Sequence, residues 1–436
     1  AAHAAAPSWA RTAPRMRADL LRGAYERVLL AREPLADLIV AEMGKVRADA
    51  LGEVDYAAEY LRWYAEEAVR IDGRWGSLPT GDRALFVGHR PVGPCLLVTP
   101  WNFPLAMAAR KLAPALAAGC TTVLKPAAQT PLTALAFGEI LLEAGLPAGT
   151  VNLVPTADAA ALVGPLLADR RLRKLSFTGS TAVGRLLVRQ SAERLLRTSM
   201  ELGGNAPFVV FADADVAAAV DGALLAKMRN GGQACTAANR FLVHRSVYDA
   251  FLAGLVERMA ALRVGPGGSG ADVGPLIDAT QLAKVQGLVD DACARGARTL
   301  LGGRALGGPG HFFAPTVLAD VPPDARLLHE EVFGPVAPVV AFDDEQEALR
   351  LANDTEYGLV AYLYTADTGR ALQLLPRFET GMVGINQGIV SNAAAPFGGV
   401  KASGMGREGG PEGLHEYLEL QYAALPLDAD VPACST

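Results

Sequence analysis

Apolar residues between positions 95 and 177 alternate between short continuous runs and runs with three- and four-residue spacing. The short runs are typical of buried strands, and the three- and four-residue spacing is typical of helices. Four strands are predicted on this basis, at Cys95–Thr99, Thr121–Leu124, Val151–Val154 and Lys174–Phe177. Because helices separate them, the pattern predicts right-handed crossovers and an α/β fold with a parallel, doubly wound sheet. Such sheets bind ligands at the carboxyl ends of their strands.

The chain before this region is predicted to be mostly helical. Residues 1–13 are Ala-rich and unpatterned, which predicts a loose or truncated start. Met16–Gly44 and Asp49–Ile71 show helical spacing, with a break near Pro34. Residues 72–94 are richer in Gly and Pro and contain the short extended run Ala84–Val87. We therefore expect a connecting β-ribbon there.

A second α/β unit begins after Glu201. Helices are predicted at Val216–Met228, Val247–Leu262 and Leu282–Ala294, and strands near Phe312–Leu318 and at Val336–Phe342, Leu359–Tyr364 and Val383–Asn386. The last extended run, Tyr417–Leu425, lies beyond this unit. We interpret it as a strand that pairs with another subunit.

Composition narrows the classes of partner. The 436 residues carry a net charge of −6 and no Lys/Arg-rich run, which argues against a nucleic-acid or membrane-surface partner. No apolar run is long enough to span a bilayer, and no signal-peptide pattern opens the chain. The prediction is a cytoplasmic protein. Five widely spaced cysteines without C-x-x-C, and scattered histidines, predict neither a disulfide framework nor a metal site.

Three segments carry candidate chemistry. Cys235 lies in N-G-G-Q-A-C-T-A-A-N, where small neighbours let a carbonyl approach the sulfur, although a buried structural cysteine is the alternative. Glu201 lies in the apolar segment M-E-L-G-G-N, where burial would raise its pKa toward that of a general base, unless it is exposed or ion-paired. The strand-to-helix turn F-T-G-S-T-A-V-G suits a phosphate, but it lacks the G-x-G-x-x-G fingerprint.

Read in order, seven segments resemble the aldehyde dehydrogenase superfamily. They are P-W-N-F-P, L-K-P-A, F-T-G-S, M-E-L-G-G-N, G-Q-A-C, E-E-V-F-G-P-V and P-F-G-G-V-K-A-S-G-M-G-R-E, and the resemblance spans roughly residues 91–422. It implies a Rossmann-like cofactor domain (1–71 and 92–203), a catalytic domain (204–402) and a bridging β element (72–91 and 416–428). It also implies a homodimer or homotetramer.

The resemblance implies roles for individual residues. Cys235 matches the nucleophile, Glu201 the general base, and Asn102 the side-chain donor to the oxyanion. Glu408 matches a carboxylate with either a proton-relay role or a structural ion pair. Positions matching cofactor contacts are Thr99, Trp101, Lys125, Ala128, Gly179, Ser180, Gly184, Glu331 and Phe333.

Matches at single positions imply the classes of substrate and cofactor. Arg110, Arg229 and Ser391 match the carboxylate clamp of the succinate-semialdehyde dehydrogenase branch, which implies a small aldehyde that also bears a carboxylate. Glutarate semialdehyde or another ω-carboxy or aliphatic aldehyde is the alternative, because one methylene gives only about 1–3 kcal/mol of discrimination. Ala128 stands where NAD-selective relatives often have Glu, so NADP is predicted, with NAD as the alternative.

Other enzyme classes fit less well. A coenzyme-A-dependent acylating enzyme would not need the base Glu201, and a cysteine hydrolase would need a histidine near these segments. A non-catalytic protein on the same fold would not need Cys235, Glu201 and Asn102 together.

Overall fold

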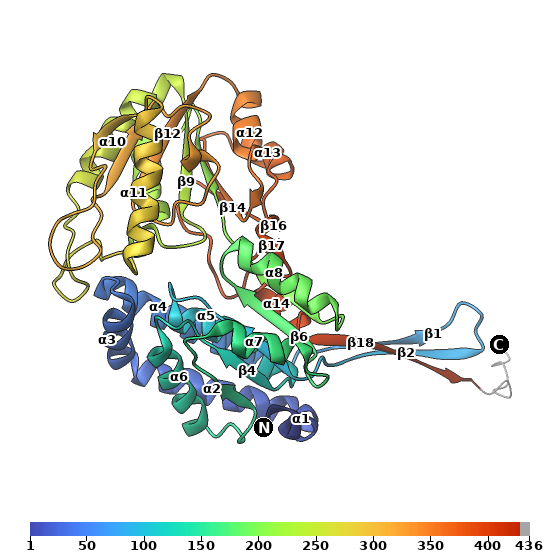
Figure 1. The fold of residues 1–436 in the computed structure, drawn as a ribbon. Helices are drawn as coiled ribbons and strands as arrows, with labels where there is room; N and C mark the ends of the chain where they lie inside the picture. The colour runs from blue at the N-terminus through green and yellow to red at the C-terminus, as the bar shows by residue number, and fades with distance from the viewer. Residues whose placement is uncertain (428–436) are drawn as a thin grey trace.

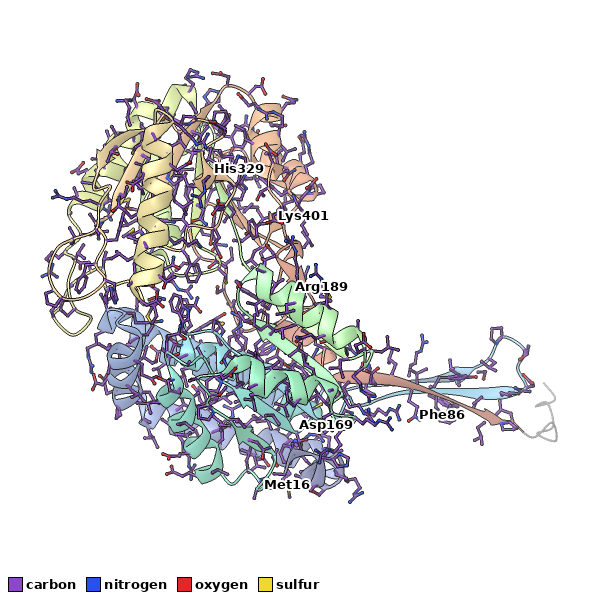
Figure 2. The ribbon with its side chains drawn as sticks, in the orientation of Figure 1. Met16, Phe86, Asp169, Arg189, His329 and Lys401 are labelled. Carbon is purple, nitrogen blue, oxygen red and sulfur yellow. The ribbon has the colours of Figure 1, made fainter. Side chains whose placement is uncertain are left out.

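The computed structural model describes residues 1–427, in which two sheet-and-helix bodies stack and a narrow β arm projects from the lower one (Figure 1). The side chains drawn as sticks in Figure 2 fill both bodies, whereas side chains on the arm, such as Phe86, extend outward. No helix in this part of the chain is long and apolar enough to cross a membrane.

The first body is built on a six-stranded sheet in the order β17-β7-β6-β3-β4-β5. Its strands are β3 (Cys95–Val98), β4 (Thr122–Lys125), β5 (Val151–Leu153), β6 (Lys174–Thr178), β7 (Arg197–Glu201) and β17 (Gly404–Met405). All neighbours are parallel except the edge pair β17–β7. The predicted parallel sheet and its first four strands are therefore confirmed, with boundaries shifted by one residue.

Helices cover this sheet. They are α1 (Ala2–Arg11), α2 (Pro14–Leu30), α3 (Arg32–Met43), α4 (Arg47–Glu67), α5 (Pro104–Ala118), α6 (Pro131–Glu143), α7 (Ala159–Ala168), α8 (Thr181–Ala192) and the late α14 (Gly410–His415). Every residue of α5 is buried, because α4 and α14 pack on it as well as the sheet. This helix begins two residues after Asn102, so the oxyanion candidate lies just before a fully buried helix.

The loose start predicted for residues 1–13 is wrong. Residues 2–11 form α1, and the Trp9 side chain is only 2% exposed in the core of the first body. The Thr121 hydroxyl also donates to the Ala2 carbonyl at 3.0 Å. A single buried Trp fixes this helix, and such a tertiary contact leaves no periodic signal in an Ala-rich sequence. The predicted break near Pro34 falls at Ala31 instead, because Pro34 is tolerated in the first turn of α3.

The second body is built on a seven-stranded sheet in the order β10-β11-β12-β9-β8-β14-β15. Its strands are β8 (Ala206–Val210), β9 (Ala238–His244), β10 (Arg298–Leu301), β11 (Thr316–Ala319), β12 (Val336–Phe342), β14 (Val360–Tyr364) and β15 (Met382–Ile385). Its helices are α9 (Val216–Met228), α10 (Tyr248–Ala260), α11 (Ala279–Ala294), α12 (Glu345–Asn353) and α13 (Thr368–Leu374). All strand pairs are parallel except β10–β11. The predicted second α/β unit is confirmed.

Short elements complete the bodies. They are the pair β13 (Tyr357–Gly358) and β16 (Val400–Lys401), and the 3₁₀ turns η1 (Arg229–Gly232), η2 (Arg245–Val247), η3 (Arg326–Leu328) and η4 (Leu375–Arg377).

The arm is a three-stranded antiparallel sheet in the order β1-β2-β18. Its strands are β1 (Arg74–Ser77), β2 (Arg83–Pro91) and β18 (Leu418–Pro426), so the predicted ribbon and last strand form one sheet. Trp75 and Leu420 on the arm are 72% and 67% exposed. The predicted bridging element also included residue 428, which lies outside the described residues; the domain boundaries themselves stay a proposal.

Candidate active site

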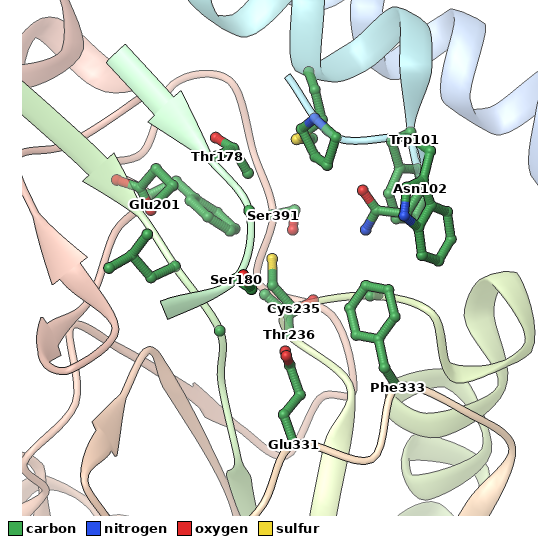
Figure 3. A pocket seen from close by; sticks show the side chains of 18 of the residues that line it. Trp101, Asn102, Thr178, Ser180, Glu201, Cys235, Thr236, Glu331, Phe333 and Ser391 are labelled. Atoms are coloured by element: carbon green, nitrogen blue, oxygen red, sulfur yellow. The ribbon is translucent and has the colours of Figure 1, made fainter. Parts of the chain in front are cut away.

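One cleft between the two bodies collects most of the predicted site residues. Asn102, Thr178 to Ser180, and Glu201 lie at or just after the carboxyl ends of β3, β6 and β7 and line one wall. The other wall comes from the segments before β9 and β12, with Cys235, Glu331 and Phe333. Figure 3 shows the Cys235 sulfur pointing into the cleft, with Asn102 on one side and Glu201 on the other.

The turn before Cys235 is held in an uncommon backbone conformation. Asn230, Gly231 and Gly232 have consecutive positive φ angles of 53°, 60° and 78°. A Cβ on Gly232 would lie 2.2 Å from the carbonyl oxygen of Gly334, so this position requires glycine. After Cys235, the Tyr362 hydroxyl donates to the Thr236 carbonyl at 2.8 Å. The backbone is therefore held in place on both sides of Cys235.

The surroundings of Cys235 favour the protonated thiol. Burial raises the pKa of its thiol to about 12, while the charges of Arg110 and Arg229 oppose that shift. The thiol must lose its proton before it can attack a carbonyl, because the thiolate is the nucleophile.

Glu201 is the general-base candidate of the cleft. Its side chain is 2% exposed, and neither carboxylate oxygen has a hydrogen-bond partner within the described residues. Burial, followed by the negative charge of Glu408, raises the pKa of Glu201 well above its ordinary value, against the opposing charges of Arg110 and Lys111. Both oxygens thus remain available to a proton donor in the cleft. The prediction that this carboxylate is buried with a raised pKa is confirmed.

Asn102 has one amide hydrogen committed and one free. Its Nδ2 donates to the Gln233 carbonyl at 3.0 Å, two residues before Cys235. An amide nitrogen carries two hydrogens, so this bond orients the second one. The Oδ1 atom has no partner among residues 1–427.

Glu408 forms an ion pair. It accepts from Arg110 Nε at 2.8 Å and from Lys111 Nζ at 2.6 Å, and it does not line the cleft. Burial would raise the pKa of Glu408, but Lys111 and Arg110 outweigh burial and lower it to about 2. Of the two roles that the resemblance left open, these contacts fit the structural ion pair.

The cofactor candidates lie along one edge of the first sheet. Gly179 and Ser180 stand at the start of the 12-residue helix α8, where backbone N–H groups are free to meet a phosphate. Phe333 packs edge-on against Trp101 with ring centroids 5.4 Å apart, and Glu331 accepts from the Gly204 amide at 3.0 Å. These residues fit an extended nucleotide that lies across the strand ends.

The remaining cofactor candidates are placed differently. A Cβ on Gly184 would lie 2.4 Å from Leu202 Cδ2, so this glycine serves helix-to-strand packing and does not line the cleft. Lys125, Thr99 and Ala128 also lie outside the cleft lining, farther along the same edge, where β4 ends beside β3. Burial lowers the pKa of Lys125, and Ala128 is exposed.

The three substrate candidates meet in the cleft. Arg229, Arg110 and Ser391 all line it, although they come from η1, α5 and the loop after β15. The Arg229 guanidinium lies 4.7 Å from the Phe103 ring centroid, and no carboxylate of residues 1–427 pairs with it. Arg110 is bound to Glu408 and lies 4.0 Å from the Phe397 ring centroid. Of the two arginines that line the cleft, Arg229 is thus the one without a carboxylate partner in the described chain.

Several lining residues were missed by sequence reasoning. Gln281 and Lys284 face the cleft from α11, three positions apart, and Thr178 brings a buried hydroxyl without a partner in the described chain. The spacing of Gln281 and Lys284 places them on one helical face, but nothing in the sequence indicated which face meets the cleft. Met107 and Phe397 supply apolar walls.

Comparison with known proteins agrees with this geometry. The model of the aldehyde dehydrogenase family matches residues 1–423. The chain belongs to the aldehyde dehydrogenase family. The expectation drawn from the seven segments is thereby confirmed.

Relatives within the aldehyde dehydrogenase family share nearly the whole chain. A succinate-semialdehyde dehydrogenase of Paenarthrobacter nicotinovorans is 57% identical over 98% of this chain and 95% of its own length. The NADP(+) succinate-semialdehyde dehydrogenase of Escherichia coli K12 is 48% identical over 98% and 89%. A glutarate-semialdehyde dehydrogenase of Pseudomonas putida is 47% identical over 98% and 88%. The crystal structure of an NADP-dependent enzyme of E. coli superposes with a TM-score of 0.96 at 48% identity, over 98% of this chain and 89% of that one.

Proposed function

We propose that this protein oxidises succinate semialdehyde to succinate with NADP. The observation that carries the proposal is the arrangement of one cleft, in which the Glu201 carboxylate and the Arg229 guanidinium, both unpaired within residues 1–427, lie around the thiol of Cys235. The thiol and carboxylate suit aldehyde oxidation, and the cation suits a substrate with a distant negative charge.

The chain's own groups account for the acyl chemistry. The Cys235 thiol releases its proton to solvent, and the thiolate sulfur bonds to the aldehyde carbon. The resulting oxyanion accepts hydrogen bonds from the free Nδ2–H of Asn102 and the backbone N–H of Cys235. When bound, the oxidised nicotinamide supplies the hydride acceptor. Re-formation of the C=O bond with loss of hydride leaves a thioester on Cys235.

Hydrolysis then releases the acid. Glu201 removes a proton from water, the hydroxide attacks the thioester carbon, and the Cys235 sulfur leaves as thiolate. A base with a raised pKa suits this step, because its conjugate acid forms near neutrality. The aldehyde has lost two electrons and gained one oxygen from water.

Arg229, Arg110 and Ser391 would hold the substrate carboxylate. The Glu408 ion pair fixes the orientation of the Arg110 guanidinium, and the Phe103 ring supports that of Arg229. Charge-assisted hydrogen bonds from two such groups and a hydroxyl favour an ω-carboxy aldehyde over an uncharged one.

Glutarate semialdehyde is the second candidate substrate, because a relative of nearly equal identity to the E. coli enzyme bears that name. The clamp residues do not distinguish the two chain lengths by charge, since both substrates end in one carboxylate. Apolar walls such as Met107 and Phe397 would set the preferred length.

The cofactor preference rests on Ala128. No carboxylate stands at this exposed position to repel a 2′-phosphate, and Lys125 supplies a cation on the preceding strand end. The cofactor residues named from the resemblance, including Thr99, Trp101, Gly179, Ser180, Glu331 and Phe333, form part of this proposal.

Assembly is the third part of the proposal. We propose a homodimer or homotetramer in which the arm pairs with a second copy, since it leaves Trp75, Leu420 and Tyr422 exposed. A cytoplasmic location stays a prediction.

Steady-state rates test the proposal most directly. Succinate semialdehyde, glutarate semialdehyde and butanal are compared with NADP and with NAD, and kcat/KM is measured for each pair. The proposal expects the highest value for succinate semialdehyde with NADP. A higher value for butanal would overturn the assigned substrate class.

A further inference from the structure

Two buried charged residues at the start of α4 contact the segment that carries Asn102, although they do not line the cleft. Lys45, just before the helix, and Glu53, near its second turn, are 1% and 3% exposed. Buried charges are costly unless they are paired and hydrogen-bonded, so their contacts indicate what they stabilise. Neither residue belongs to the cleft lining.

Lys45 contacts the oxyanion segment directly. Its Nζ donates to Glu53 Oε2 at 2.6 Å and to the backbone carbonyl of Asn102 at 2.8 Å. The same nitrogen lies 3.8 Å from the ring centroid of Phe103. Burial lowers the pKa of Lys45, whereas the charge of Glu53 and its hydrogen bond oppose that shift. The ammonium group is therefore held by the segment that carries Asn102.

Glu53 fixes the other side of that segment. Its Oε1 accepts from the backbone amides of Leu105 at 2.9 Å and Ala106 at 3.2 Å, in the first turn of α5. These amides have no partner within their own helix, and the positive end of the helix dipole favours a carboxylate there. One carboxylate thus holds both Lys45 and the beginning of α5.

The Asn102 carbonyl also meets the turn that precedes the nucleophile. Besides Lys45, it accepts from Asn230 Nδ2 at 2.9 Å, so both of its lone pairs are used. Asn230 Nδ2 contacts the Gln233 carbonyl too, at 3.2 Å, and this is the oxygen that orients the Asn102 amide. A shift of the Asn102 main chain would therefore change the aim of its side chain.

We propose that Lys45, held by Glu53, is a positioning residue for the oxyanion donor Asn102. It fixes the Asn102 main chain so that the free amide hydrogen stays aimed at the developing oxyanion. The inference rests on the proposed role of Asn102. Such donors act only when they are correctly placed before the reaction, and displacements of about 1 Å can cost about a hundredfold in rate.

A double-mutant cycle tests this coupling. The single-turnover rate of NADPH formation from succinate semialdehyde is measured for Lys45→Met, Asn102→Ala and the double variant. Lys45→Met is expected to slow the reaction at least tenfold in the otherwise unchanged chain and less than twofold in the Asn102→Ala chain. NADPH binding, followed by its fluorescence, is expected to stay within twofold.

Lys174→Met is the matched control. Lys174 is also fully buried, but its partners are Ser199 and Glu416, away from the cleft. Its replacement is expected to change the rate by the same factor with and without Asn102→Ala.

Two results would overturn the inference, and they are distinct. If Lys45→Met slows both backgrounds by the same factor, Lys45 is merely structural and the assignment of Asn102 stands. If Asn102→Ala alone leaves the rate unchanged, the oxyanion assignment fails together with the positioning. Should Lys45→Met not fold, Glu53→Gln enters the same cycle, because glutamine keeps an oxygen for the α5 amides but loses the charge that holds Lys45.

Discussion

Arg110 Nε donates to Glu408 Oε2 at 2.8 Å, and both side chains are almost fully buried. This ion pair distinguishes Arg110 from Arg229, the other arginine of the proposed carboxylate clamp. Arg110 compensates the buried charge of Glu408, whereas Arg229 has no carboxylate partner within residues 1–427. Replacing one partner of a buried pair leaves an uncompensated charge and typically costs about 3–5 kcal/mol. Arg229 is therefore the residue at which substrate binding can be tested without that cost.

Arg229→Met is expected to lower kcat/KM for succinate semialdehyde by about tenfold to 150-fold, the equivalent of about 1.5–3 kcal/mol for one charge-assisted contact. Methionine keeps an apolar contact with Phe103. Butanal, which lacks the acid, should be oxidised nearly as well as by the unchanged enzyme. Arg110→Met should lower the melting temperature as well, because Glu408 keeps only Lys111.

The exposed Arg245, which pairs with Asp343, provides the control: Arg245→Met should affect neither aldehyde. Equal losses on both aldehydes for Arg229→Met would mean that this arginine is structural. Ser391→Ala should show the same selectivity with a smaller loss, since a neutral hydrogen bond contributes about 0.5–1.5 kcal/mol.

Cys235→Ala is expected to abolish turnover and leave the fold and NADPH binding intact, because the alanine has no sulfur to attack the aldehyde. Glu201→Gln should lose multiple turnovers yet retain a burst of reduced cofactor, since the amide cannot deprotonate the hydrolytic water. Rapid-mixing absorbance at the reduced-nicotinamide band measures both. Full turnover by either variant would reject its assignment.

Glu408→Gln is expected to move the pH dependence of turnover toward lower pH. Glu201 must be deprotonated to act as a base, so turnover rises with pH through its raised pKa. The Glu408 charge helps to raise that pKa, and Arg110 and Lys111 oppose it. Removing the Glu408 charge leaves the two cations uncompensated, and both changes lower the pKa of Glu201.

The pH profile of kcat measures this shift, and the melting temperature should fall, because a buried ion pair is broken. Glu416→Gln is a suitable control, as this partly exposed carboxylate contacts Lys174 and Ser199 instead. An unchanged profile in Glu408→Gln would show that the Glu408 charge does not act on Glu201.

Ala128→Glu is expected to move the ratio of kcat/KM values toward NAD, because a carboxylate would repel the 2′-phosphate of NADP. The unchanged enzyme should prefer NADP, and an NAD preference above about tenfold, or about 1.4 kcal/mol, would reject that prediction. Gln129→Glu, at the exposed neighbour, controls for added charge alone. No change in Ala128→Glu would mean that position 128 does not face the ribose.

Cys235 is expected to form no local disulfide. Thr236 and Ala237 follow it, and the buried Cys95 and Cys120 belong to the first sheet and its connection. Peroxide treatment should therefore inactivate the enzyme by direct oxidation of Cys235. Peptide mass spectrometry after oxidation checks this, and a dithiol-reversible intrachain disulfide at Cys235 would contradict it.

The sequence by itself determined the class of fold and the residues of the chemistry. The alternation from Cys95 to Phe177 follows from burial on both faces of a parallel sheet, so it was readable without any tertiary contact. Small and apolar neighbours made Cys235 and Glu201 candidates, and the seven segments read together gave them their roles. Arg110, Arg229 and Ser391 were found only through the resemblance.

Only the tertiary structure decided how these residues are held. Helix α1 exists because Trp9 is buried, and Glu408 is ion-paired because α5 brings Arg110 and Lys111 to it across almost 300 positions of sequence. Lys45 reaches the Asn102 carbonyl 57 positions away. A charged side chain at a helix end has the same sequence pattern whether it meets water or a buried carbonyl. The environment that distinguishes these cases is created by packing between distant segments, so periodicity and local motifs carry no trace of it.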